Sequence, residues 1–158
     1  MAVADWSAVA TDDYNRSNGA IGANYEDGYG GVAPEVESNQ LVSGSSGNDG
    51  SAEWTADSFN NDQYSEIEVT DDTNGEHYVG VNVRMADVVS GGDMYTYWTD
   101  GDAETGCERI DDDSATSLQS GMTDPNINED MAIEIIGTTI RFYIERAEVD
   151  TPETDATY

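Results

Sequence analysis

Carboxylates are the most numerous side chains in this sequence that could do chemistry, and one stretch spaces them as a catalytic pair would be spaced. In EIEVTD, residues 66–71, one residue separates Glu66 from Glu68, and Asp71 follows. On a strand the two glutamates share a face, with carboxyl groups about 5–7 Å apart, in the range that retaining glycoside hydrolysis needs. Such pairs also arise by chance, because the chain has 34 Asp and Glu residues. We favour the interpretation that they coat the polar face of a strand, and we expect no enzymatic activity.

Aromatic side chains are the second group of candidates, because their flat rings can serve as platforms for sugars. In MYTYW, residues 94–98, Tyr95 and Tyr97 share one face of a strand and Trp98 lies on the other, so one face is expected to be core. Tyr29 lies in a glycine-rich loop. We favour core packing and contacts between copies over sugar binding for these rings, since interfaces are rich in Tyr and Trp. The predicted ligand-binding residues are Trp54, Tyr95, Tyr97 and Trp98.

Acidic clusters are the third group, because Ca²⁺ prefers oxygen ligands. The candidates are the run Asp111, Asp112 and Asp113 and the pair Asp71–Asp72. Neither matches an EF-hand loop, and we favour solvated carboxylates over a Ca²⁺ site. Cys107 is the single cysteine, which excludes an internal disulfide and a cysteine-based zinc site. His77 has no partnered Ser–Asp or Cys arrangement. We expect no cofactor, with Ca²⁺ at Asp111, Asp112 and Asp113 as the alternative.

The charge balance of the whole chain is extreme. Its formal net charge is -29, all five of its basic residues are Arg, and it has no Lys. At about 1 M salt the Debye length falls to about 3 Å, which screens the self-repulsion of such a surface. A disordered acidic chain is the alternative, but 37% of the residues are hydrophobic. We predict a folded protein of a high-salt environment that does not bind nucleic acid, because phosphate contacts need clustered Lys and Arg.

The elements that position these residues are strands. YSEIEVT, residues 64–70, alternates Ser65, Ile67 and Val69 on one face with polar residues on the other. HYVGVNVRM, residues 77–85, repeats the pattern. Its inward-facing residues are predicted to be Val79, Val81, Val83 and Met85.

MAIEIIGTTIRFYIE, residues 131–145, predicts a hairpin with a two-residue turn at Gly137 and Thr138. Three independent pairings agree on one register. They place Ile135 opposite Ile140, Ile133 opposite Phe142, and Glu134 opposite Arg141. Cross-strand pairs of these kinds stabilise antiparallel sheets.

Loops rich in Gly, Ser, Asn and Asp join the predicted strands, and one short helical turn could lie within residues 113–119. Residues 151–158 are expected to be a loop, a tail or a contact segment. Many short strands with little helix predict an antiparallel β-sandwich. We expect one domain over residues 1–158, with residues 12–150 as its core.

DDYNRSNGAIGANY, residues 12–25, resembles the D-[FY]-x-R-x-[DN]-G-x-[LI]-G-x-x-[WY] start of concanavalin A-like, laminin-G-like jelly-roll domains. PEVESNQLV (34–42), DQYSEIEVT (62–70) and YVGVNVRM (78–85) resemble further strands of that family, and AIEIIGTTIRFYIE (132–145) resembles its hairpin. The motif residues that match are Asp13, Tyr14, Arg16, Asn18, Gly19, Ile21, Gly22 and Tyr25.

The resemblance implies a jelly-roll sandwich that can bind glycans on a sheet face or at loop tips. Family members close with a last strand that the C-terminal residues do not provide. It would be absent, supplied by a neighbour, or formed by VADWSAV, residues 3–9. EIEVTD also resembles the E-x-D-x-x-E signature of jelly-roll glycosidases, with the order of its acids changed.

From the residues alone, Gly19 and Gly22 are where a positive φ would be used, and Arg16 is expected to tie Asp12 or Asp13 into a corner.

These observations predict a non-enzymatic, self-assembling surface module of a halophilic system, with a virion surface subunit (capsid decoration, turret or fibre) as the first expectation. A glycan-binding module for cell-surface sugars is the alternative, and a jelly-roll glycosidase is third. The expected partners are further copies of the chain, other structural proteins of an assembly, and a cell-surface glycan.

The first residues, MAVADWSAV, lack the basic region and apolar core of a secretion signal. No run approaches the roughly 18 apolar residues of a membrane helix, so membrane insertion is not expected, and the predicted location is a virion or an extracellular surface.

Overall fold

The computed structural model describes residues 10–27, 33–42, 51–70, 78–86, 92–100 and 104–158. The chain divides into two compact units, Met1–Ser58 and Phe59–Tyr158. Within the described ranges, thirteen strands pair in four antiparallel sheets and no helix occurs. The prediction of an all-β, antiparallel β-sandwich is confirmed. The jelly-roll, concanavalin A-like arrangement and the single domain over residues 1–158 stay predictions.

The strands of the first unit are short and form a three-stranded sheet, β1-β3-β4, and a two-stranded sheet, β2-β5. Their bounds are β1 (Gly19–Ala20), β2 (Tyr25–Asp27), β3 (Glu35–Glu37), β4 (Gln40–Val42) and β5 (Ala52–Trp54).

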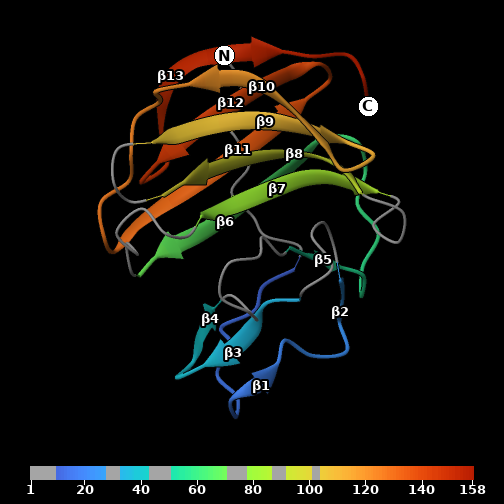
Figure 1. Ribbon diagram of the computed structural model, residues 1–158, viewed down its shortest axis with the longest axis vertical. Helices are drawn as coiled ribbons and strands as arrows, with labels where there is room; N and C mark the ends of the chain where they lie inside the picture. Colours follow the sequence, from blue (N-terminus) through green and yellow to red (C-terminus); the bar gives the residue numbers. More distant parts are fainter. Residues whose placement is uncertain (1–9, 28–32, 43–50, 71–77, 87–91, 101–103) are drawn as a thin grey trace. The chain divides into compact units, whose positions relative to one another are not determined.

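The second unit is built from two four-stranded sheets (Figure 1). One has the order β10-β9-β8-β7, and its four strands follow one another in the chain as a meander. The other has the order β13-β12-β11-β6, with β6 added to a three-stranded meander. The strands are β6 (Gln63–Val69), β7 (Val79–Ala86), β8 (Asp93–Thr99), β9 (Thr105–Asp111), β10 (Ser114–Ser120), β11 (Glu129–Ile136), β12 (Thr139–Ile144) and β13 (Ala147–Thr154).

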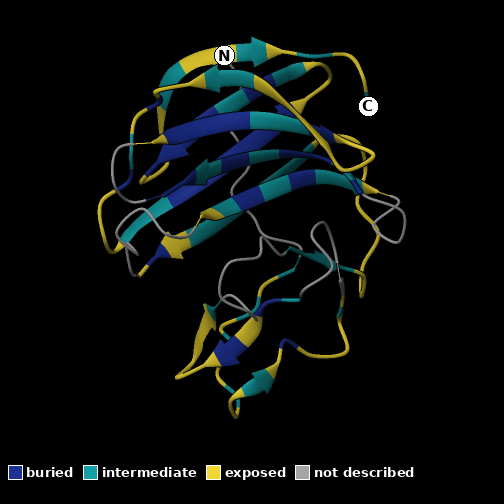
Figure 2. Cartoon of the chain, in the orientation of Figure 1, coloured by how far each residue is buried: buried dark blue, intermediate teal, exposed yellow. Residues whose placement is uncertain are grey.

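The two sheets of the second unit enclose one hydrophobic core, and its strands alternate between buried and more exposed positions (Figure 2). Tyr97 of β8 meets Phe142 of β12 across the layers, with ring centroids 5.3 Å apart. Burial of such aromatic and branched side chains is the main force that holds two sheets together. The core cluster contains Val69, Val81, Val83, Tyr95, Tyr97, Cys107, Met122, Met131, Ile133, Ile135, Ile140 and Phe142.

The hairpin of β11 and β12 has the predicted register. Ile133 pairs with Phe142, Glu134 with Arg141, and Ile135 with Ile140. The turn is Gly137 and Thr138, and Gly137 has a φ of 59°. A positive φ at the first of two turn residues is what a type II′ hairpin turn requires, and glycine adopts it without steric cost.

Strand β7 departs from the predicted alternation at both ends. Val81 and Val83 are buried as predicted, whereas Val79 is exposed and Met85 is only half-buried. A bulge between Val83 and Ala86 breaks the pairing with β8, and Arg84 in it has a φ of 53°. A bulge shifts the residues beyond it out of the simple two-residue period.

Two segments form strands where the sequence suggested otherwise. The predicted helical turn within residues 113–119 is wrong, because β10 covers Ser114–Ser120. Residues 151–154 complete β13 instead of forming a tail, and Tyr158 packs against the core. Pairing with β9 and β12, respectively, outweighs the weak local preference of these Ser/Thr-rich stretches. VADWSAV, residues 3–9, lies outside the described residues.

In the first unit, the motif at residues 12–25 makes a charged corner. Arg16 forms an ion pair with Asp12 and donates to the carbonyl of Ile21, and Tyr25 donates to Asp12 over 3.1 Å. The expected partners of Arg16 were Asp12 and Asp13, and the ion pair is with Asp12. The backbone turns at two glycines, which have φ values of 135° at Gly19 and 119° at Gly22, as predicted.

Candidate functional site

Trp98 lies on the face of the β10-β9-β8-β7 sheet that points away from the core. Its neighbour Tyr97 and the alternate residue Tyr95 are fully buried in the core cluster. Neither tyrosine ring can present a face to a ligand, which corrects their prediction as binding residues. The physical reason is the two-residue period of a strand: when Tyr95 and Tyr97 face inward, Trp98 must face outward.

Two glycines flank Trp98 on the neighbouring strands. Gly80 of β7 and Gly106 of β9 are its register partners on either side. A Cβ atom at Gly106 would lie 3.0 Å from Cζ2 of the indole, and one at Gly80 would lie 3.1 Å from Cβ of Trp98. The indole therefore lies close over the backbone of β9, in space that a side chain would fill.

Tyr78 extends the aromatic surface. Its ring stands at 81° to the indole of Trp98, with the two centroids 4.9 Å apart, and 58% of the Tyr78 residue is exposed. Edge-to-face pairs of this kind are a favoured aromatic geometry. The two rings make an aromatic corner, open to solvent at Tyr78.

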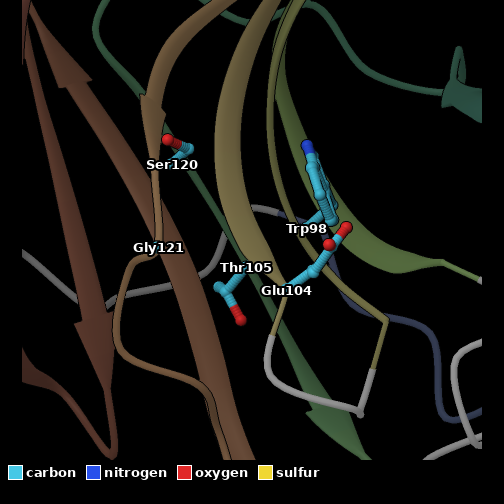
Figure 3. A pocket seen from close by; sticks show the side chains of 5 residues that line it. All are labelled: Trp98, Glu104, Thr105, Ser120 and Gly121. Carbon is cyan, nitrogen blue, oxygen red and sulfur yellow. The ribbon is translucent and has the colours of Figure 1, made fainter.

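Polar residues complete a hollow beside the indole, with a volume of about 340 Å³. Figure 3 shows Trp98 and Glu104 on one side of it and Ser120 and Gly121 on the other, with Thr105 between them. The volume is in the range of small-molecule sites, roughly 300–1,000 Å³. An indole, a carboxylate and the hydroxyl group of Ser120 thus line one hollow, and the buried Thr105 forms part of its wall.

The polar residues of the hollow are held by a network behind them. Thr105 donates from Oγ1 to Asp124 over 2.8 Å, and Thr99 also donates to Asp124. Asp100 accepts a hydrogen bond from the backbone N–H of Glu104 over 3.0 Å and donates its own N–H to the carbonyl of Glu104 over 3.0 Å. These bonds fix the end of the β8–β9 hairpin on which the site is built.

One buried polar atom of the indole lacks a hydrogen-bond partner within the part of the chain that the structure describes, namely Nε1 of Trp98. Gly106 of β9 lies between Trp98 on β8 and Gln119 on β10, and a Cβ there would contact both the indole and the backbone carbonyl oxygen of Gln119. Buried donors are nearly always satisfied, so the indole N–H has hydrogen-bonding capacity for a water molecule or a ligand.

Trp54 does not join this site. It lies on β5 in the first unit, where its ring stands at 88° to that of Tyr25 with centroids 5.0 Å apart. Its Nε1 donates to Asp57 over 2.9 Å. The predicted four residues are therefore distributed over a corner of the first unit, the core, and the outer face of one sheet.

Asp111, Asp112 and Asp113 form the turn between β9 and β10. Asp112 and Asp113 have φ values of 51° and 64°. Two successive positive φ values define a type I′ hairpin turn, and aspartate tolerates this conformation better than most residues. No group of three or more His, Cys, Asp or Glu in the described ranges is placed to hold a metal ion. Calcium binding at this turn stays a prediction.

One glutamate of the pair on β6 is engaged in an ion pair. Arg146 donates to both carboxylate oxygens of Glu66, over 3.0 and 3.2 Å. Glu68 is exposed. The other candidates singled out from the sequence, Asp71, Asp72, His77 and Tyr29, lie outside the described residues.

Cys107 is fully buried in the core, and this burial raises the pKa of its thiol. It contributes to packing as a small hydrophobic residue.

Sequence reasoning missed most of the residues around Trp98. Tyr78, Glu104 and Ser120 lie on three different strands or their ends, and no local pattern connects them. One signal was available, because glycines inside strands mark a close approach of another group. Gly80 and Gly106 are such glycines, and both point to Trp98.

No family model, curated protein or solved structure matches this chain. The function must therefore be argued from the site. Among the described residues, no helix is long and apolar enough to cross a membrane.

Proposed function

We propose that the chain is a non-enzymatic glycan-binding module and that Trp98 is the centre of its site. The observation that supports this most strongly is the aromatic corner of Trp98 and Tyr78 beside a hollow with Glu104, Thr105 and Ser120. Sugars have apolar C–H faces that pack on aromatic rings and hydroxyl groups that need hydrogen-bond partners. Apolar rings with a few convergent polar groups are the usual composition of a ligand site.

The charge of the chain indicates that the ligand is a neutral glycan. With a net charge of -29 the protein repels anions, and among the described residues the one charged group that lines the hollow is the carboxylate of Glu104. Sialylated, sulfated or phosphorylated sugars would add a second negative charge beside it. A neutral oligosaccharide donates hydroxyl hydrogens to the carboxylate without that cost.

The test is a panel of neutral and anionic oligosaccharides probed with the wild-type protein and with Trp98→Ala, in about 1 M or more KCl to screen repulsion. We expect neutral glycans to bind, and Trp98→Ala to weaken binding at least tenfold, about 1.4 kcal/mol. Tyr78→Ala should cause a smaller loss, because Tyr78 contributes the open wall of the corner.

The matched control is Trp54→Ala, which removes a tryptophan from the first unit. Circular dichroism of each variant verifies the fold. If no neutral glycan binds, or if Trp98→Ala binds as the wild type does while Trp54→Ala does not, the proposal is wrong.

A self-assembling surface subunit, including a virion surface subunit of a halophilic system, is the second candidate. Strand β10 favours it, because this edge strand carries no charged residue in a chain of net charge -29. Glycan binding and assembly are compatible, since surface subunits can do both. Particles or defined oligomers that contain the chain would support this candidate.

A further inference from the structure

Strand β10 stands apart from the other strands of the second unit. Its sequence, SATSLQS, has no Asp, Glu or Arg, whereas each of the other seven described strands of this unit has at least one. The lack of charge continues through Gly121 to Thr123. The first four residues of β10 are exposed, and the last three include the half-buried Leu118 and Gln119. β10 ends its sheet, with β9 as its one partner among the described strands.

The other three edges of the sandwich carry features that oppose pairing with another strand. β13 has Pro152 and a carboxylate at Glu148, Asp150 and Glu153. β6 presents Glu66 and Glu68, and β7 is broken by the bulge at Arg84. Charges, proline and bulges are the known means by which edge strands avoid association. β10 has a bulge toward β9 at Leu118 but neither charge nor proline.

We propose that β10 is the contact between two copies of this chain, which pair antiparallel through this strand. A second copy is the partner that the charges favour. Two chains of net charge -29 repel each other, so a stable contact must form where neither contributes a carboxylate. A strand without charge, with one row of backbone N–H and C=O groups facing away from β9, meets that condition.

The charges also favour one register. A two-fold axis at Ser117 places Ser114 of one copy opposite Ser120 of the other. The acidic turn of Asp112 and Asp113 then lies beside Gly121 and Met122 of the partner, which have no charge. The two acidic turns lie at opposite ends of the paired strands, about 24 Å apart for seven residues at about 3.4 Å each.

The pairing has a consequence for ligand binding, which rests on the proposed glycan function. Antiparallel pairing joins the two β10-β9-β8-β7 sheets into one, and the two-fold axis is perpendicular to it. Both Trp98 side chains then lie on the same face. Five strand spacings of about 4.8 Å separate the two β8 strands, about 24 Å across the sheet. Such a pair can bind two sugars of one surface at once.

The test uses Ser117→Glu and Ser117→Lys, each of which places two like charges opposite each other at the two-fold axis. In about 1 M or more KCl, light scattering should give twice the 17.0 kDa mass for the wild type. Each variant alone should dissociate at least tenfold more readily. An equimolar mixture of the two should recover the doubled mass, because Glu then faces Lys.

Thr70→Glu is the control, because it adds the same charge at an exposed position directly after β6, the edge strand at the end of the sandwich away from β10 (Figure 1). It should leave the doubled mass unchanged. The inference is overturned if the wild type is a monomer at millimolar concentration, if the folded Ser117→Glu variant keeps the doubled mass, or if the mixture does not recover it.

Failure of pairing and failure of glycan binding are distinguishable. Ser117→Glu should bind a soluble monovalent glycan as the wild type does, but it should bind a dense glycan surface less tightly than the wild type. Trp98→Ala should lose both kinds of binding and keep the doubled mass.

Discussion

Asp155 shows how a single carboxylate fastens the C-terminal end of the chain to the sandwich. Tyr95 donates to its Oδ1 over 3.0 Å, Arg109 donates to its Oδ2 over 2.6 Å, and Thr157 donates its backbone N–H over 2.7 Å. Burial by itself would raise the pKa of Asp155. The hydrogen bonds from Thr157, Tyr95 and Arg109 outweigh burial and lower the pKa to about 2.

The lowered pKa predicts a pH dependence of stability. The folded pKa of about 2 lies below the ordinary value of 3.8, so Asp155 stabilises the fold above pH 3.8. This stabilisation is lost as the pH falls through about 2. Asp155→Asn should lower the free energy of unfolding by about 1–3 kcal/mol at pH 7. Denaturant unfolding at several pH values should show this difference shrinking between pH 4 and pH 2.

Glu37→Gln removes one carboxylate from an exposed position of β3 and is the matched control. Its difference from the wild type should stay small at every pH. A difference for Asp155→Asn that stays constant down to pH 2 would show that the hydrogen bonds do not favour the ionised carboxylate.

The role of Asp155 could not be predicted from the sequence. Its partners Tyr95 and Arg109 lie 60 and 46 residues away along the chain. No periodic pattern connects such distant side chains. From the sequence, an acidic residue in this position is expected to lie on the surface in contact with solvent. The outward direction of Trp98 could be predicted in part. Strand alternation places Trp98 on the face opposite to Tyr95 and Tyr97, and the burial of the two tyrosines in the structure shows that Trp98 is on the outer face.

At the scale of elements, the glycines beside Trp98 set how closely three strands approach. A Cβ at Gly80 would lie 2.6 Å from the carbonyl oxygen of Tyr97, which is backbone and cannot move freely. At Gly106 the nearest atom is Cζ2 of the indole. An alanine at position 80 would therefore have to displace backbone, whereas an alanine at position 106 would have to displace the indole side chain.

We predict that Gly80→Ala lowers the free energy of unfolding by about 1–3 kcal/mol, because the β7–β8 pair must separate. Gly106→Ala should displace the indole and weaken glycan binding more than it affects stability. Val79→Ala, at an exposed position next to Gly80, is the control and should change stability little. Unchanged glycan affinity in a folded Gly106→Ala variant would argue against the indole as the platform.

The β11–β12 hairpin was predictable in full and β10 was not, for a physical reason. In the hairpin, apolar pairing, the ion pair of Glu134 with Arg141 over 3.6 Å, and the glycine turn all specify one register. β10 has few apolar residues, and its strand state depends on β9. The bulge in β7 depends likewise on a tertiary contact, since Gln63 of β6 accepts the backbone N–H of Arg84 over 2.6 Å.

At the scale of the whole molecule, every arginine of the chain is already engaged. Arg16, Arg109, Arg141 and Arg146 form ion pairs with carboxylates. Arg84 donates to the backbone carbonyls of Asn61, Gly137 and Tyr158. The other carboxylates have no arginine left to balance them, so their mutual repulsion acts against the compact state.

Stability should therefore rise steeply with salt. Between about 0.1 M and about 1 M the Debye length falls from about 10 Å to about 3 Å, which screens most of the repulsion between surface carboxylates. Thermal unfolding followed by circular dichroism should show Tm increasing across this range. A Tm that is independent of KCl, or that falls with it, would contradict the high-salt interpretation.

The most direct test of glycan binding at Trp98 is a ¹H–¹⁵N NMR titration that follows the tryptophan indole N–H signals as a neutral oligosaccharide is added in KCl. The Trp98 indole has no described hydrogen-bond partner, whereas that of Trp54 donates to Asp57. We predict that the Trp98 signal shifts saturably while the Trp54 signal stays in place. A bound oligosaccharide that leaves the Trp98 signal unmoved would contradict the account.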